Sequence, residues 1–304
     1  MSKSVYVGLD IGSSRTKVAV LDADRKLLGH AIKKSGTDFS ATAQVCLDAS
    51  LEMAGATRED IVQAVSTGYG RTNVAFVTDQ HKTEIGCLAN WCRRAVLDPM
   101  GGSPDHGVGG SRGGHRERSE QAVPPGYIPG LITLIDIGGQ DNKIVKLDQD
   151  GRRSSFKMNR KCAAGTGAFL EEMSYRLDIP IEDMDGLARA SKEMVKLGSY
   201  CTVFSATEVL ENIRNGKHVT DIVKGLFYSV VKRVLEMDLP SQTVVMTGGV
   251  VAHNPYIVDM TEEMLGRPVL RPEYPQLAGA MGAAVYAIEA KGESSSEPSE
   301  GELP

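Results

Sequence analysis

Two stretches of this chain carry the same pattern, and this repeat restricts the fold more than any other feature of the sequence. Residues 5–9 and 131–135 are apolar and strand-like, and each stretch runs into Asp-Ile-Gly, at 10–12 and 136–138. In both copies a lysine follows the aspartate by seven positions, and the copies lie 126 residues apart (136 − 10). Alternating residues after each glycine turn predict a returning strand. We therefore expect an α/β fold with two similar domains, each beginning with a β-hairpin.

The remaining hydrophobic periodicity supplies both domains with further elements. Helical patterns occur at 39–53, 82–96, 219–235 and 255–265, and strand-like runs at 61–66 and 242–246. Ser205 and Glu208 have the spacing of a capping box, which predicts a helix that starts at Ser205 and stops at Gly216. Gly279 opens a last helix of small residues that can pack closely.

Composition divides the chain into segments. Residues 98–130 are rich in Gly, Pro, Ser and charge, which predicts a disordered insertion, and 291–304 have the composition of a disordered tail. We expect residues 1–97, joined by the C-terminal helix 279–290, to form the first domain. Residues 131–278 then form the second.

Bulk properties limit the function classes. The 304-residue chain carries a net charge of −5 and only 5% aromatic residues, which argues against a nucleic-acid partner but leaves a nucleotide ligand open. The sequence offers no signal peptide and no apolar run that could cross a bilayer, so we expect no membrane association and a cytoplasmic location. Five cysteines, an odd count, indicate free thiols or metal ligation rather than a disulfide framework.

The two acidic hairpins suit a nucleoside triphosphate with Mg²⁺. Glycine turns offer backbone N–H donors to phosphate oxygens, and carboxylates hold the metal, here through water. We expect Asp10 and Asp136 near Mg²⁺, and Gln140 or Asp141 to orient the attacking water. The other predicted nucleotide contacts are Gly12, Ser13, Ser14, Lys17, Gly138, Gly139 and Asp141. The alternative is two ordinary hairpins, in which Asp and Gly are common turn residues.

A third glycine turn follows the predicted strand 242–246. There Gly248 and Gly249 could let an adenosine lie flat against the backbone. The order of phosphate turn, second phosphate turn and adenosine turn resembles the superfamily of actin, Hsp70 chaperones and sugar kinases. This resemblance implies two actin-like (ribonuclease H-like) domains with ATP or ADP in the cleft between them.

Two cysteines precede predicted helix starts. Cys162 comes before the Gly165-Thr166-Gly167 turn, and Cys201 lies four residues before Ser205. The first turn could cradle a phosphate or activate a thiol, and both cysteines could equally be small buried residues. Helix dipoles and free N–H groups would also stabilise an anionic metal–sulfur cluster. A 4Fe–4S cluster needs four ligands, which a second chain about a two-fold axis would complete.

Five segments together resemble the ATPase activators of 2-hydroxyacyl-CoA dehydratases, whose wider family includes the ATPase subunits of benzoyl-CoA reductases. The segments are 67–71, 136–141, 161–169, 201–209 and 246–254. The resemblance implies a homodimer, or a heterodimer with a paralogue, that shares one 4Fe–4S cluster held by Cys162 and Cys201 of each chain. It also implies ATP in each subunit, helices that swing beside the cluster, and a low-potential electron passed to an iron–sulfur dehydratase or reductase. Ferredoxin or flavodoxin is the expected donor.

The chain departs from that family in two places. It has the long 98–130 segment where the family has a short link, and Ser-Ala-Thr at 205–207 where the family often has Ala-Glu-Ser. A small-molecule kinase of the same fold without a cluster is the alternative, and Asp141 would then be its base. A non-enzymatic actin- or chaperone-like ATPase is a third hypothesis, which leaves the paired cysteines unexplained. The three remaining cysteines are expected to be packing residues: Cys46, Cys87 and Cys92.

Overall fold

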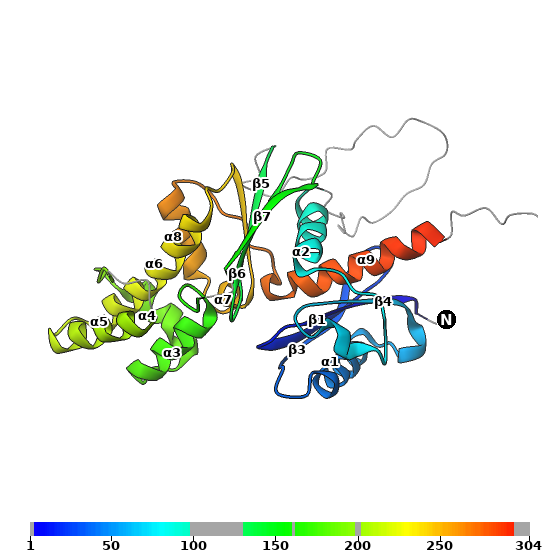
Figure 1. Ribbon diagram of the computed structural model, residues 1–304, viewed down its shortest axis with the longest axis horizontal. Coiled ribbons are helices and arrows are strands. Elements are labelled where there is room, and N and C mark those ends of the chain that lie inside the picture. The colour runs from blue at the N-terminus through cyan, green and yellow to red at the C-terminus, as the bar shows by residue number, and fades with distance from the viewer. Residues whose placement is uncertain (1–2, 98–129, 160–161, 198–201, 295–304) are drawn as a thin grey trace, which may run out of the picture.

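Two four-stranded mixed sheets form the framework of the protein (Figure 1). The computed structural model describes residues 3–97, 130–159, 162–197 and 202–294. The first sheet has the order β3-β2-β1-β4, and the second has the order β7-β6-β5-β8. Their strands are β1 (Val5–Ile11), β2 (Arg15–Leu21), β3 (Leu27–Lys34) and β4 (Ile61–Thr67), then β5 (Ile132–Ile137), β6 (Asn142–Leu147), β7 (Arg153–Asn159) and β8 (Thr243–Thr247). Both predicted hairpins are confirmed.

The duplication extends to single residues and to a third strand of each sheet. In each copy the aspartate lies opposite the lysine of the returning antiparallel strand and beside a threonine of the parallel strand. These residues are Asp10, Lys17 and Thr67 in the first sheet, and Asp136, Lys143 and Thr247 in the second. Each threonine is followed by a glycine with positive φ, Gly68 at +93° and Gly248 at +100°. The two sheets therefore present the same groups at corresponding edges.

Helices cover both faces of each sheet. On the first sheet, α1 (Phe39–Ala54) packs against one face and α9 (Ala278–Ser294) against the other. On the second sheet, one face carries the largest apolar core, which includes side chains of all the helices from α3 to α8, and α2 (Glu84–Cys92) covers the other face. Those helices are α3 (Gly167–Leu177), α4 (Met184–Ala190), α5 (Thr202–Arg214), α6 (Val219–Met237), α7 (Gly249–His253) and α8 (Tyr256–Leu265).

Local signals explain where two of the helices begin. Asp38 accepts a hydrogen bond from the Ala41 amide (2.9 Å) at the start of α1, and Thr83 accepts one from the Gly86 amide (3.1 Å) at the start of α2. Side-chain oxygens at these N-cap positions satisfy amides that have no partner within the helix. α1 ends at Gly55, whose φ of +60° suits the left-handed cap.

Helices α2 and α9 meet between the two sheets at the level of their backbones (Figure 1). A Cβ built on Gly282 would lie 1.9 Å from the carbonyl oxygen of Cys87, so a glycine is required at this contact. Gly8 of β1 is equally close to the Ala280 carbonyl of α9. Cys87, Cys92 and Cys46 are all fully buried, which confirms that they are packing residues.

Several expectations need correction. Ser205 lies inside α5, which runs from Thr202, so the predicted capping box does not mark the start of this helix. The strands β3 and β7 were not predicted, and α9 continues to Ser294, four residues into the expected tail. Residues 98–129 of the expected insertion and 295–304 of the expected tail lie outside the described residues.

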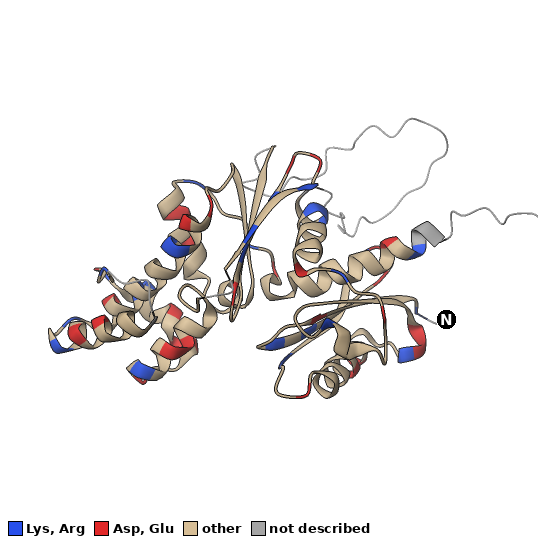
Figure 2. Ribbon diagram, viewed as in Figure 1, with Lys and Arg blue, Asp and Glu red and all other residues tan. Residues whose placement is uncertain are grey.

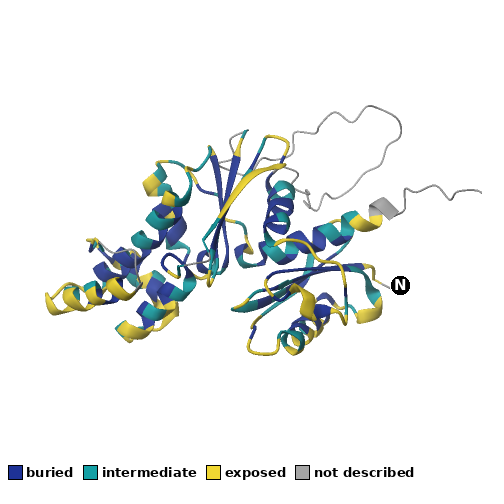
Figure 3. Cartoon of the chain, viewed as in Figure 1, coloured by how far each residue is buried: buried dark blue, intermediate teal, exposed yellow. Residues whose placement is uncertain are grey.

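The described surface is mixed in charge and includes an exposed sheet edge. The outer helices α3 and α5 carry acidic residues along their length and an arginine near the C-terminal end (Figure 2). The edge strand β7 is exposed along most of its length (Figure 3). Among the described residues, no helix combines the length and apolar character that crossing a membrane requires.

Candidate functional site

A cavity of about 870 Å³ lies between the two sheets, at the edge where both hairpin turns are found. Its volume falls in the range of sites that enclose a drug-sized ligand, about 300–1,000 Å³. The structure gathers at this cavity every residue for which the sequence predicted a nucleotide or catalytic role. They are Asp10, Gly12, Ser13, Ser14, Lys17, Asp136, Gly138, Gly139, Gln140, Asp141, Gly248 and Gly249.

The first hairpin turn is closed by its own backbone. The Gly12 amide donates to the Arg15 carbonyl (3.1 Å), and a Cβ on Gly12 would lie 2.7 Å from that same oxygen. Ser35 donates to the Gly12 carbonyl (2.6 Å) and fixes the turn from behind. Lys17 Nζ lies 2.9 Å from Asp10 Oδ2, and both side chains keep some exposure to the cavity, 18% and 14%. This turn therefore presents a lysine and a carboxylate together.

The second hairpin turn repeats this geometry and faces the first. The Gly138 amide donates to the Asp141 carbonyl (2.9 Å), as Gly12 does to Arg15. A Cβ on Gly139 would lie 3.1 Å from Ser14 Oγ, so the two turns approach each other closely across the cavity. The arrangement brings backbone amides from both sheets to one place, as binding of a polyphosphate requires.

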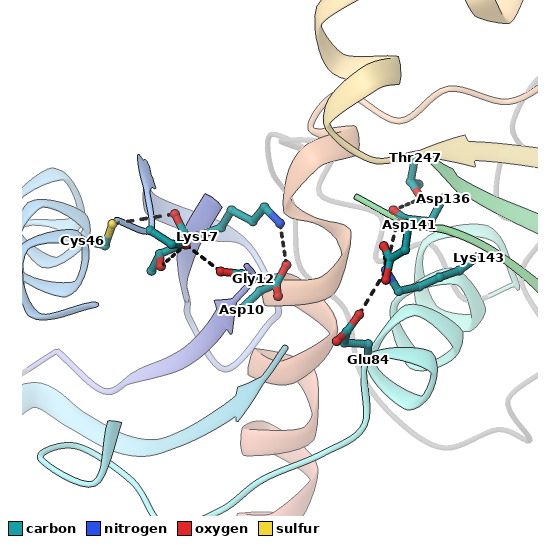
Figure 4. A network of polar contacts seen from close by, with 11 residues as sticks. Asp10, Gly12, Lys17, Cys46, Glu84, Asp136, Asp141, Lys143 and Thr247 are labelled. Atoms are coloured by element: carbon teal, nitrogen blue, oxygen red, sulfur yellow. Dashed lines mark hydrogen bonds and ion pairs between the residues drawn. The ribbon is translucent and has the colours of Figure 1, made fainter. Parts of the chain in front are cut away.

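A buried lysine is surrounded by three carboxylates beside the second turn (Figure 4). Lys143 Nζ lies 2.6 Å from Asp141, 3.0 Å from Glu84 and 3.7 Å from Asp136, and the Lys143 side chain is 7% exposed. Burial lowers the pKa of Lys143, but Asp136, Glu84 and Asp141 outweigh this and raise it overall. Lys143 is therefore charged, and its charge is largely neutralised by these carboxylates.

The pKa of Asp136 is higher than that of an exposed aspartate. Burial raises its pKa, and this is opposed by Lys143, Lys17 and the Thr247 hydroxyl, which donates to its Oδ1 (2.9 Å). A divalent cation beside Asp136 would favour the charged carboxylate and reverse the effect of burial. The chemistry of this position thus fits a water-mediated metal contact.

Sequence reasoning missed Glu84, which takes part in this network. Glu84 is the first residue of α2, and α2 packs against the second sheet, so the carboxylate reaches Lys143 from 59 positions away in the sequence (143 − 84). No local pattern marks it, because an acidic residue in the first turn of a helix is commonplace. Its role depends on tertiary packing that the sequence does not display.

The cavity is also lined by residues that follow β8 and by residues near α3. They include Val250, His253 and Asn254 after β8, and Leu170, Glu171, Ile181 and Glu182. The chain leaves β8 through Gly248, and this position must be a glycine because a Cβ there would lie 2.3 Å from the Ile137 carbonyl oxygen. The absence of side chains at Gly248 and Gly249 leaves their backbone open to a ligand in the cavity.

Cys162 lies in a partly exposed loop before α3 and does not line the cavity. The expectation of free amides at the start of α3 is wrong for its first two residues. Gly167 and Ala168 donate to the carbonyls of Gly138 and Gly139, at 2.9 and 2.7 Å. Cys201, the other predicted ligand, lies outside the described residues, and within those residues no three His, Cys, Asp or Glu side chains gather as a metal site.

Comparison with known proteins identifies the family. The family model described as "BadF/BadG/BcrA/BcrD ATPase family" matches residues 127–287. The chain is 35% identical to the 2-hydroxyisocaproyl-CoA dehydratase activator of Clostridioides difficile, over 96% of this chain and 97% of that one. This chain belongs to the BadF/BadG/BcrA/BcrD ATPase family. It is also 34% identical to the activator of lactoyl-CoA dehydratase from Anaerotignum propionicum, over 93% of this chain and 97% of the relative.

Solved structures of this ATPase family agree with the fold. Component A of (R)-2-hydroxyglutaryl-CoA dehydratase from Acidaminococcus fermentans superimposes with a TM-score of 0.80 at 30% identity, over 95% of this chain and 99% of that one. The Clostridium difficile 2-hydroxyisocaproyl-CoA dehydratase activator with bound ADPNP gives 0.79 at 32% identity, over 98% and 100%. A glucokinase from Streptomyces griseus shares the fold alone (13% identity over 94% of this chain and all of that one, TM-score 0.53). The predicted actin-like α/β fold is confirmed.

Proposed function

We propose that this ATPase activates a CoA-ester dehydratase or reductase by passing it a low-potential electron at the expense of ATP. The observation that carries the proposal is the pair of matching glycine turns facing each other across one cavity, with a partly exposed cysteine loop hydrogen-bonded to the second turn. The C. difficile and A. propionicum relatives activate dehydratases, which supports the same class of partner here. The expected donor is a ferredoxin or a flavodoxin.

In this proposal the two turns hold the phosphates and position the water. Amides of Ser13 and Gly139 bind phosphate oxygens, and Lys17 neutralises their charge. Asp10 and Asp136 hold Mg²⁺ through water. Of the two residues predicted to orient the attacking water, Gln140 is favoured, because Asp141 is hydrogen-bonded to Lys143 at 2.6 Å. The same bond disfavours a sugar-type kinase, which would need Asp141 as a free base.

The nucleotide contacts fall on both halves of the chain. We assign residues 1–97 with 279–290 to the first domain and 131–278 to the second, so that ATP joins the two domains. Gly248 and Gly249 then lie against the adenosine at the second domain. Closure on ATP and opening after hydrolysis would change the position of the elements that begin at the second turn.

The cysteine chemistry fits a 4Fe–4S cluster shared between two chains. Of the four cysteines in the described residues, three are buried, and Cys162 is partly exposed. With Cys201 it gives two ligands per chain, so a second copy or a paralogous subunit completes the four. At the start of α5, beside Cys201, Val203 and Phe204 are 69% and 64% exposed, which supports a partner chain over this face. The cluster would supply one-electron transfer at low potential.

Anaerobic reconstitution with iron and sulfide tests this function. We expect about four irons per dimer, an EPR signal after dithionite reduction, and loss of both in Cys162→Ala, because four thiolates hold such a cluster. ATP hydrolysis should fall by about 10² or more in Asp136→Asn, a group that holds the metal. Wild-type protein that binds no iron, or a Cys162→Ala variant with an unchanged cluster, would refute the electron-transfer function.

A further inference from the structure

The loop that carries Cys162 is attached to the second hairpin turn at several points. Besides the two amides of α3 that donate to Gly138 and Gly139, the Asn142 side chain donates to the Gly165 carbonyl at 2.8 Å. The contact between backbones is tight, since a Cβ on Gly167 would lie 3.1 Å from the Cα of Gly139. The turn and the loop therefore cannot shift independently.

Asn142 occupies the central position in this attachment. It begins β6, directly after the turn, and is fully buried. Its cross-strand neighbour on β7 is Asn159, whose side chain donates to the Cys162 carbonyl at 3.2 Å. Two adjacent asparagines thus hold both ends of the 162–165 loop. Gly165, at the other end of the loop, is buried and has a φ of +83°, a conformation that residues with a side chain rarely adopt.

The first sheet lacks this arrangement, although its hairpin is otherwise equivalent. There the Gly12 carbonyl accepts from Ser35 Oγ, and the Ser14 carbonyl accepts from the Ser35 amide (3.1 Å). Ser35 follows the end of β3 and leads into α1 by way of the Asp38 cap. Of the two duplicated turns, the second alone, among the described residues, is bonded to a cysteine-bearing loop.

We propose that Asn142 is a positioning residue that couples occupancy of the Gly138–Gly139 turn by a nucleotide phosphate to the position of Cys162. The inference rests on the proposed function, because it takes the turn as a phosphate site. A phosphate that draws the turn amides toward the cavity moves the carbonyls of the same peptides. Those carbonyls hold the start of α3, and Asn142 ensures that the loop before α3 follows.

The test measures the reactivity of the Cys162 thiol in full-length, iron-free protein. The protein is saturated either with Mg-ADP or with a Mg-bound non-hydrolysable ATP analogue and is then treated with iodoacetamide. Mass spectrometry of the digested protein gives the labelling rate of Cys162 separately from that of Cys201. In the wild type the alkylation rate of Cys162 should differ by about fivefold between the two nucleotides. A factor of this size corresponds to one hydrogen bond made or lost. In Asn142→Ala the ratio should fall to about one, while nucleotide affinity changes by less than about twofold.

Two further variants keep the test decisive. Asn212→Ala is the matched control, because Asn212 makes the same kind of bond, to the Glu208 carbonyl at 2.8 Å, within α5; its ratio should equal that of wild type. Asn159→Ala removes the other attachment at a partly exposed site, so it should fold even if Asn142→Ala does not, and should raise the Cys162 rate with both nucleotides.

The outcomes separate this inference from the proposed function. Folded Asn142→Ala that binds nucleotide and keeps the wild-type ratio would overturn the coupling, as would an unchanged Cys162 rate in Asn159→Ala. Wild type that binds nucleotide and shows the expected labelling ratios, yet assembles no cluster on reconstitution, would overturn the electron-transfer function and leave the coupling intact. Wild type whose labelling does not respond to nucleotide, despite measured binding and a full cluster, would overturn the coupling alone.

Discussion

Replacing Lys143 with methionine should destabilise the protein far more than the same change at Lys146, three residues along β6. The Lys143 side chain is 7% exposed, and its Nζ lies within 4 Å of Asp136, Asp141 and Glu84. Without the cation, three carboxylates face one another in a buried site. Removing one partner of a buried ion cluster costs about 3–5 kcal/mol. Lys146 pairs with Asp238 at 3.0 Å and is 26% exposed, and such a pair contributes about 0–1 kcal/mol.

The loss at Lys143 should also depend on pH. In the wild type the pKa of Lys143 is raised, because the three carboxylates outweigh burial. The stabilisation of the folded state by Lys143 is therefore complete below the unfolded pKa of about 10.4. It is lost only as the pH rises through the higher pKa of the folded state. In Lys143→Met the facing carboxylates should have pKa values raised above their unfolded values of about 4. The folded variant then takes up protons more readily, so its deficit shrinks as the pH falls.

Urea unfolding, followed by circular dichroism at about pH 7.5 and about pH 5, measures both effects on the wild type, Lys143→Met and Lys146→Met. Adding Glu84→Gln to Lys143→Met removes one of the three repelling charges and should recover part of the lost stability at the higher pH. Equal losses for the two lysine variants, or a Lys143 deficit that is the same at both pH values, would contradict the electrostatic reasoning.

Three further expectations concern positions where the backbone or burial leaves little freedom. Gly282→Ala should lower the free energy of unfolding by about 2 kcal/mol or more, since its Cβ would meet the Cys87 carbonyl at 1.9 Å, whereas Gly186→Ala, with nothing within 4 Å, should not destabilise in the same urea experiment. Gly139→Ala should weaken ATP binding by about tenfold, seen by calorimetry, because the methyl group would enter the gap to Ser14. Cys87 and Cys92, whose pKa values burial raises to about 12, should resist iodoacetamide at about pH 8 until the protein is unfolded.

Local sequence patterns predicted the strands and helices that bury one face. They did not predict an exposed strand or the residue at which α5 begins. The hairpins were predictable from the glycine turn and from the lysine seven residues after the aspartate. In an antiparallel pair joined by such a turn, this spacing places Asp10 opposite Lys17, as the structure shows. The edge strand β7 was missed because an exposed strand has no reason to alternate. Ser205 misled because Ser-x-x-Glu is only a local signal, and here Ser205 is buried inside a helix that had already begun.

The site could be predicted as a set of residues but not as a network. Every predicted nucleotide residue reached the cavity, because turns at corresponding edges of two equivalent sheets meet when the sheets face each other. Glu84 could not be found in this way, since its place depends on α2 packing against a sheet formed much later in the sequence. The bonds from Asn142 and Asn159 to the cysteine loop likewise follow from the β6–β7 register, which required the missed strand β7.

The backbone contact between Gly8 and Ala280 also has a consequence for synthesis of the protein. The two residues are 272 positions apart (280 − 8), and α9 is the layer that covers Tyr6 and Val65 on one face of the first sheet. On the ribosome, the N-terminal strands emerge first, yet this face stays open until almost the whole chain has been made. The part of the protein that begins to form first is therefore completed last, and a nascent chain that stops before α9 leaves an apolar sheet face exposed to aggregation.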